Sequence, residues 1–242
     1  MIKNIIARIL AVWTAIAFIG TMLIFLIPIW VTGIFGEPSS TAWMIRFSRM
    51  WMALFFPLSL IKVKINGKEN FQKGENYIVV CNHNSFMDVP LSSPGIPGAN
   101  KTIAKVEMSR IPLFGIIYKR GAVLINRKDE NNRKESYQKM KDVLNMGIHM
   151  CIYPEGTRNK TDQPLKSFHD GAFRLSMDTG KKIIPAIIRG TKEMLPTNKT
   201  FYFWPGTISM QFLLPIDPKE FSNLNALKEH VHKVMIDVYT SY

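Results

Sequence analysis

The apolar positions of this chain begin with one long uninterrupted run. From Ile9 to Trp30 nearly every residue is apolar, and residues 9–36 carry no charged side chain. A helix needs about 20 such residues to cross a membrane. Lys3 and Arg8 also suit the positive start of a secretory signal peptide, but the apolar run exceeds the about 7–15 residues of such a signal. The pattern therefore favours a membrane anchor near the N-terminus.

A second apolar helix is predicted from Thr41 to Leu60, after three residues that break the first helix toward its end, namely Pro28, Gly33 and Pro38. This second segment carries two tryptophans and two arginines: Trp43, Arg46, Arg49 and Trp51. Such residues suit a helix at the level of the lipid headgroups. The alternative is a hydrophobic helix that packs on the soluble domain. If the first helix enters the membrane and the second returns, the positive-inside tendency places the rest of the chain on the cytoplasmic face.

Strand and helix patterns alternate over the rest of the chain. Short apolar runs predict strands at Val63–Ile65, Tyr77–Cys81, Thr102–Ala104, Ala122–Ile125, Ile148–Tyr153, Ile183–Ile188 and Ile208–Leu214. Helical spacing predicts helices at Asp129–Asn145, Asp170–Thr179 and Leu224–Tyr239. Pro185 within one strand indicates an edge or a bulge. The alternation is typical of an α/β domain with a mixed, mainly parallel sheet flanked by helices. We therefore assign residues 1–60 to membrane-anchoring helices and residues 61–242 to this domain.

Charge narrows the class of partner without choosing one. Apolar residues make up 47% of the chain and charged residues 20%, which is enough for a sizeable core. The net charge of +13 favours an anionic partner: nucleic acid, an anionic membrane face or a phosphate-bearing substrate. The lysines and arginines are scattered, and no recognised nucleic-acid module is present, so we expect no nucleic-acid partner.

Several other classes of site lack their sequence signals. Cys81 and Cys151 lie inside apolar runs without metal-ligand spacing, which indicates reduced core thiols. No Gly-x-Ser-x-Gly motif is present, which argues against a serine hydrolase. The sequence also contains no metal-ligand cluster and no nucleotide fingerprint. We therefore expect neither a metal nor a cofactor.

A histidine and an aspartate follow the predicted strand Tyr77–Cys81, in the run Asn82-His83-Asn84-Ser85-Phe86-Met87-Asp88. A histidine titrates near neutrality and can take a proton from a hydroxyl group. A carboxylate on its other ring nitrogen would fix the tautomer and stabilise the imidazolium. On a straight helix the two side chains would point roughly 140° apart, so His83 and Asp88 meet only if a turn intervenes. Taken alone, the pair also fits a structural histidine that caps a turn.

A second polar segment, Tyr153-Pro154-Glu155-Gly156-Thr157-Arg158, follows the strand at Ile148–Tyr153. Thr157 and Arg158 bring a hydroxyl, backbone N–H groups and a guanidinium, which together can hold a phosphate. Arg127 offers another guanidinium at the end of a strand. A surface turn with a Glu155–Arg158 ion pair is the alternative.

These blocks, in this order, resemble the glycerolipid acyltransferase family that contains the 1-acyl-sn-glycerol-3-phosphate acyltransferases. The resemblance covers about residues 65 to 215. The first block is Asn82–Asp88, and the third, Tyr153–Arg158, matches its family pattern fully. The second, Gly121–Arg127, has Leu124 where the family often has Phe, and the fourth, Ile184–Ile187, has Ala186 where Val or Ile is usual. Lys105 and the segment Ile111–Gly115 also look like the family's linker.

The resemblance implies a role for each block. His83 would be the general base and Asp88 its orienting partner. Glu155, Gly156, Thr157, Arg158 and Arg127 would form the binding site for the glycerol phosphate of the acceptor. Lys105 is a further candidate, for oxyanion stabilisation, although it also suits a surface lysine.

The reaction implied is transfer of an acyl chain to the sn-2 hydroxyl of 1-acylglycerol 3-phosphate, which gives phosphatidic acid. The donor is an acyl thioester, either acyl-CoA or an acyl-carrier protein. Membrane lipids would be the other partner. Two alternatives remain open at this point: an acyltransferase for another lyso-lipid, and a lipid-binding homologue without turnover.

Overall fold

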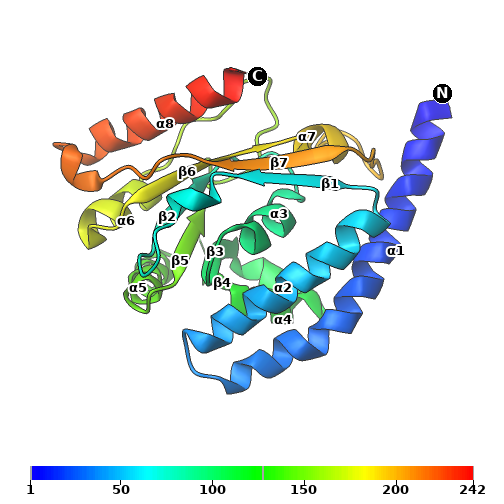
Figure 1. Cartoon of the computed structure of the whole chain (residues 1–242), viewed down its shortest axis with the longest axis horizontal. Helices are drawn as coiled ribbons and strands as arrows, with labels where there is room; N and C mark the ends of the chain where they lie inside the picture. The colour runs from blue at the N-terminus through cyan, green and yellow to red at the C-terminus, as the bar shows by residue number, and fades with distance from the viewer. Residues whose placement is uncertain (1, 127, 242) are drawn as a thin grey trace.

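A computed structural model describes residues 2–126 and 128–241. Its centre is a seven-stranded sheet in the order β1-β7-β6-β2-β5-β3-β4 (Figure 1). All neighbouring strands are parallel except β6 and β7, which are antiparallel. The strands are β1 (Lys62–Asn66), β2 (Ile78–Cys81), β3 (Asn100–Lys105), β4 (Ala122–Ile125), β5 (His149–Ile152), β6 (Ile183–Arg189) and β7 (Thr207–Phe212). The predicted mixed, mainly parallel sheet is confirmed.

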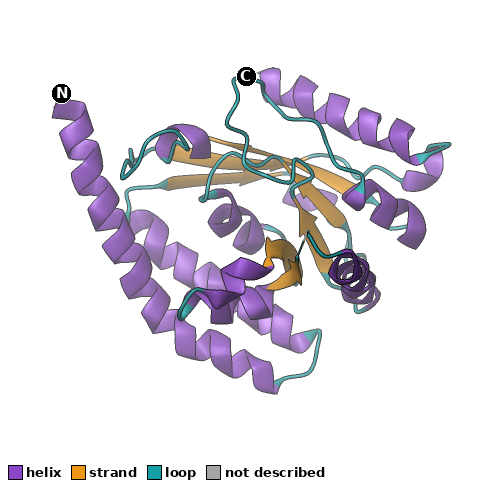
Figure 2. Cartoon of the chain, turned by 180° about the vertical axis from the view of Figure 1, so that it is seen from behind, coloured by secondary structure: helices purple, strands orange, loops and turns teal. Residues whose placement is uncertain are grey.

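Helices cover both faces of the sheet (Figure 2). They are α1 (Ile2–Val31), α2 (Ser39–Leu58), α3 (Asp88–Gly95), α4 (Phe114–Gly121), α5 (Glu130–Asn145), α6 (Gly171–Thr179), α7 (Thr191–Met194) and α8 (Leu224–Thr240). Short 3₁₀ turns lie at Thr32–Ile34, Lys68–Asn70, Val106–Arg110 and Pro218–Glu220. Local signals set the start of α5 and the end of α6. Asp129 caps α5 by accepting a hydrogen bond from Asn132 N, and Gly180 ends α6 in the left-handed conformation, with φ of 67°.

The central strands are buried on both faces, which explains why they read as continuous apolar runs. Val79 and Cys81 of β2 point into a core shared with α1 and α2. Ile78 and Val80 point into a second core shared with α5, α6 and α8. Cys81 and Cys151 are buried free thiols with their sulfur atoms 3.8 Å apart, as expected of reduced core residues.

The expectation for Pro28 is corrected, and of the two alternatives for Pro185 the structure shows the bulge. Pro28 does not end the first helix but lies inside α1, three residues before its last residue, Val31. Pro185 lies in β6, an interior strand between β2 and β7. Ala186 of β6 pairs with Phe212, and Ile183 pairs with Ile216. The segment that pairs with β6 therefore has one more residue between these two positions than β6 has. The pairing is therefore bulged at Pro185, but the strand is not an edge.

The two N-terminal helices pack side by side along one end of the molecule (Figure 1). One side of α1 is buried along its whole length, at Ala7, Thr14, Ala17, Thr21, Met22 and Ile29. Trp51 of α2 is buried and donates from Nε1 to Thr21 Oγ1 at 2.9 Å. The guanidinium of Arg49 donates to the carbonyls of Pro94, Ile96 and Gly98.

The expected headgroup position of Trp51 is therefore wrong, because this side chain is buried in the protein. Arg49 is exposed, and its headgroup position stays a prediction. Trp43 is exposed, and the Arg46 guanidinium lies 5.1 Å from its ring centroid, so the headgroup position of this pair stays a prediction.

His149, at the start of β5, is a buried neutral imidazole. Its Nδ1 accepts from Tyr77 N at 2.9 Å, and its ring stacks on that of Tyr77. Burial lowers the pKa of His149 from 6.5 to about 4, opposed by a backbone hydrogen bond with Pro97. Because the unfolded chain takes up this proton first, stability is complete above about pH 6.5 and falls as the pH drops toward about 4.

We expect the loss of unfolding free energy over this window to reach about 3 kcal/mol, from 1.36 kcal/mol per pKa unit. A His149→Asn variant keeps an acceptor near Tyr77 N but does not titrate. Melting temperatures measured between pH 7 and 4 should fall more steeply for the natural protein than for the variant. Parallel curves would show that His149 does not control this pH dependence.

Candidate active site

The first element of the site is the loop that follows β2. Strands β2 and β5 are adjacent and parallel, so the residues after both strands meet at the same edge of the sheet. Such carboxyl-terminal edges are where open α/β sheets bind ligands. Asn82 fixes the first loop to the neighbouring strand: its side chain accepts from Ile188 N at 2.7 Å and donates to Ile188 O at 2.8 Å.

His83 and Asp88 meet because a tight turn separates them. Nδ1 of His83 lies 2.8 Å from Oδ2 of Asp88, which is the first residue of α3. The same Oδ2 accepts from the backbone N–H groups of Asn84 at 2.6 Å and Ser85 at 2.7 Å. Asp88 is completely buried, whereas the His83 side chain is 20% exposed. The predicted intervening turn is confirmed.

This arrangement prepares the imidazole to act as a base. An ionised carboxylate only accepts hydrogen bonds, so Nδ1 carries the ring proton and Nε2 keeps its lone pair. The Tyr153 ring supports the imidazole, with the two ring centroids 4.4 Å apart, and its hydroxyl lies 2.6 Å from Ser92 Oγ. Burial raises the pKa of Tyr153, which keeps this support uncharged.

Glu155 joins the two loops of the site. Its carboxylate is buried, with Oε1 accepting from His83 N at 2.7 Å and Oε2 from Lys166 N at 3.1 Å. Asn159 N also donates to His83 O at 2.6 Å. Burial raises the pKa of Glu155, and these N–H groups oppose the rise. The geometry gives Glu155 a positioning role for His83, which the spacing of residues in the sequence did not indicate.

For the remaining predicted site residues we describe positions around the His83–Asp88 pair rather than contacts with it. Gly156 has φ of 71°, which permits the sharp turn. Thr157 is exposed, and its Oγ1 accepts from Lys166 Nζ at 2.7 Å. The Arg158 guanidinium lies 3.6 Å above the Phe86 ring. Lys105 ends β3 with an exposed side chain. Arg127 lies outside the described residues.

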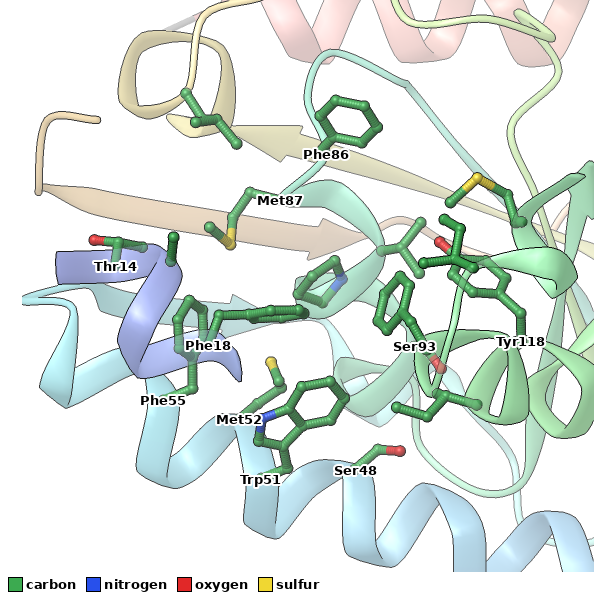
Figure 3. Close-up of a pocket in the computed structure, with 18 of the residues that line it drawn as sticks. Thr14, Phe18, Ser48, Trp51, Met52, Phe55, Phe86, Met87, Ser93 and Tyr118 are labelled. Atoms are coloured by element: carbon green, nitrogen blue, oxygen red, sulfur yellow. The ribbon is translucent and has the colours of Figure 1, made fainter. Parts of the chain in front are cut away.

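An apolar cavity of about 630 Å³ opens beside these loops. Figure 3 shows Phe18 of α1 and Trp51, Met52 and Phe55 of α2 on one side of it, with Phe86 on the other. Arg158 is one of the few charged residues that line it. The sequence did not place this cavity, because its walls come from segments that are distant in the chain, among them the two N-terminal helices. A base beside an apolar cavity can deprotonate a hydroxyl group on a molecule with a long hydrocarbon chain.

The family model described as Acyltransferase matches residues 62–189, which include both loops of the site. The chain belongs to the acyltransferase family. The resemblance drawn from its motifs is thereby confirmed. The His83–Asp88 pair lies in the amino-terminal part of the matched region, and the Glu155 loop lies nearer its end.

Curated relatives and a solved structure agree with this assignment. The 1-acyl-sn-glycerol-3-phosphate acyltransferase of Cocos nucifera is 32% identical over 66% of this chain and 53% of its own. The Escherichia coli protein of the same name is 27% identical over 74% and 73%. The crystal structure of the 1-acyl-sn-glycerophosphate acyltransferase of Thermotoga maritima has a TM-score of 0.78 at 25% identity, covering 98% and 95%. The chain spans about half the length of several curated relatives it matches.

The role of Glu155 in this acyltransferase is testable by Glu155→Gln. The amide keeps one acceptor oxygen, so either His83 N or Lys166 N loses its partner. Hydrogen bonds to charged groups contribute about 1.5–3 kcal/mol, and we expect the free energy of unfolding to fall by that order. We also expect kcat to fall while the acceptor KM changes little, because His83 is displaced but the acceptor's binding groups are kept.

Steady-state kinetics and thermal melting of the variant check this expectation. Glu135→Gln, at an exposed position of α5, is the matched control and should change neither. A raised acceptor KM at normal kcat would instead place Glu155 in contact with the substrate, as the family resemblance implied.

Proposed function

We propose that this acyltransferase moves an acyl chain from an acyl thioester to the sn-2 hydroxyl of 1-acylglycerol 3-phosphate, giving phosphatidic acid. The observation that carries the proposal is the His83 Nδ1–Asp88 Oδ2 contact of 2.8 Å, in a loop whose residues Phe86 and Met87 line an apolar cavity together with Arg158. The names of the relatives from Cocos nucifera and Escherichia coli support the choice of acceptor.

The proposed reaction needs a base but no enzyme nucleophile, because a thioester is already activated. His83 Nε2 takes the hydroxyl proton as the acceptor oxygen attacks the thioester carbonyl carbon. Asp88 stabilises the imidazolium that forms. The carbon–sulfur bond then breaks, and the proton passes to the leaving thiolate. Lys105, at the end of β3, is the proposed cation for the developing oxyanion.

The acceptor's two ends suit different parts of the site. Arg158, Arg127, Gly156 and Thr157 are the groups proposed to hold its glycerol phosphate, because guanidinium and backbone N–H groups bind phosphate oxygens well. The apolar cavity is proposed to hold hydrocarbon chain. Its volume of about 630 Å³ lies within the range of about 300–1,000 Å³ usual for ligand pockets.

The N-terminal helix gives the protein its expected association with a membrane. The segment Ile2–Ile34 is long and apolar enough to cross a bilayer. Of the residues in its most apolar stretch, 17% are buried in the protein. Its outer face exposes apolar residues along its length, including Ile9, Trp13, Ile16, Ile24 and Ile27. We propose that this face contacts lipid. We also propose that the catalytic loops face the cytoplasm, because Lys3 and Arg8 at the start of the helix favour the cytoplasmic side.

An assay with purified protein, radiolabelled lysophosphatidic acid and varied acyl donors tests the proposed reaction. We expect labelled phosphatidic acid from the natural protein, with the acyl group at the sn-2 position. His83→Ala and Asp88→Asn should each lose about 100- to 10,000-fold in rate, the usual contribution of a general base. Their melting curves should show folded protein.

Two results would contradict the proposal. Normal turnover by a folded His83→Ala protein would exclude this base. Acylation of a different lyso-lipid, or lipid binding without turnover, would favour the corresponding alternative.

The role of Arg158 is testable by Arg158→Ala. Loss of one charge-assisted hydrogen bond, worth about 1.5–3 kcal/mol, should raise the acceptor KM about 10- to 100-fold. The donor KM should change far less. Arg174→Ala, at an exposed position of α6, is the matched control. A rise confined to the donor KM would show that Arg158 binds the thioester substrate instead.

A further inference from the structure

Four large apolar side chains outside the N-terminal helices are exposed around the cavity. We call them the rim cluster: Phe86 (62% exposed), Ile111 (41%), Leu113 (48%) and Phe201 (70%). Phe86, Ile111 and Phe201 line the cavity, and Leu113 lies two residues beyond Ile111. Phe86 is visible at the edge of the cavity in Figure 3. Single exposed apolar residues are common, but a group gathered at one opening indicates an interaction surface.

The backbone holds two of these side chains outward in an unfavourable conformation. Leu113 has φ of 61° and Phe201 has φ of 47°. Bulky residues rarely adopt this region, which costs about 1–3 kcal/mol where the surrounding structure enforces it. Hydrogen bonds on both sides fix the first turn, from Gly115 N to Ile111 O and from Ile116 N to Leu113 O. The exposure of these side chains is therefore built into the fold.

Two of the three rim segments, those that contain Leu113 and Phe201, contact α1. Phe203 N donates to Ala7 O at 3.2 Å, two residues after Phe201. The Phe114 ring lies 5.9 Å from that of Phe18, one residue after Leu113. The rim cluster is thus continuous with the helix whose outer face is apolar and exposed.

Cations accompany the rim cluster. Arg158 and Lys199 line the same cavity, and Lys199 Nζ lies 4.4 Å from the Tyr202 ring centroid. Lys3 Nζ lies 4.9 Å from the Trp204 ring centroid. Aromatic and cationic side chains together are typical of the headgroup level of a bilayer, where lysine and arginine attract anionic lipid.

We propose that the rim cluster is a second membrane contact, which enters the lipid interface beside α1 and seals the cavity opening against the leaflet. The inference rests on the proposed lipid substrate. An acceptor would then pass from the leaflet into the cavity without exposing its chain to water, which costs about 0.8 kcal/mol per CH₂.

Site-specific fluorescence tests this contact on the full chain. A nitrobenzoxadiazole dye is attached to Phe201→Cys and, as a second site, to Leu113→Cys. Cys81 and Cys151 are 0% exposed, so the natural protein should take up no dye. Leu214→Cys is the matched control: Leu214 is 74% exposed and follows β7, at the sheet edge opposite the His83 loop. The proteins are bound to vesicles of equal parts phosphatidylcholine and phosphatidylglycerol, with or without acyl chains that carry a nitroxide quencher.

On the vesicles we expect blue-shifted emission from the labels at Phe201 and Leu113, and strong quenching by the nitroxide. The label at Leu214 should show neither change. Emission at Phe201 and Leu113 that matches the Leu214 label on membrane-bound protein would overturn the proposal. Since this emission does not depend on turnover, quenched labels on a protein without acyl transfer would refute the proposed function and leave the contact standing. Unquenched labels on a protein that transfers acyl chains would refute the membrane contact and leave the proposed function standing.

Discussion

One carboxylate oxygen, Oδ2 of Asp88, organises the site. It is buried and accepts hydrogen bonds from His83 Nδ1, Asn84 N and Ser85 N. Two of these donors belong to the backbone of the turn, so the same oxygen shapes the loop and orients the base. A side chain of a different length would move this acceptor away from the turn, whereas Asn would keep an acceptor oxygen but could not stabilise the imidazolium. The spacing of five residues follows from this turn.

The order of the strands supplies the second constraint. Because β2 lies between β5 and β6, the loop with His83 is bordered by the Glu155 loop on one side and by Ile188 on the other. Blocks that are far apart in the sequence therefore contribute to one rigid position for the imidazole. The buried carboxylate of Glu155 is stable there because two backbone N–H groups replace the water it loses.

Much of this was predictable from local patterns, and the exceptions share a cause. The strand at Ala122–Ile125 follows from a short-range signal, and the turn between His83 and Asp88 meets the condition set for their contact. Strand order, and with it the role of Glu155, depends on contacts between distant segments, which apolar runs do not encode. Trp51 was misplaced because a protein core and a membrane favour the same apolar helix, and its partner Thr21 is distant in sequence.

That ambiguity also reveals how α1 and α2 work. Phe18, Trp51 and Phe55 belong to the core beneath the sheet and line the cavity. The helices proposed to contact lipid therefore also form part of the binding site, although their sequence reads as a separate anchor of residues 1–60. Because α1 and α2 pack on the core of the domain, the cavity walls and the lipid-contacting face proposed for α1 keep one fixed position relative to His83.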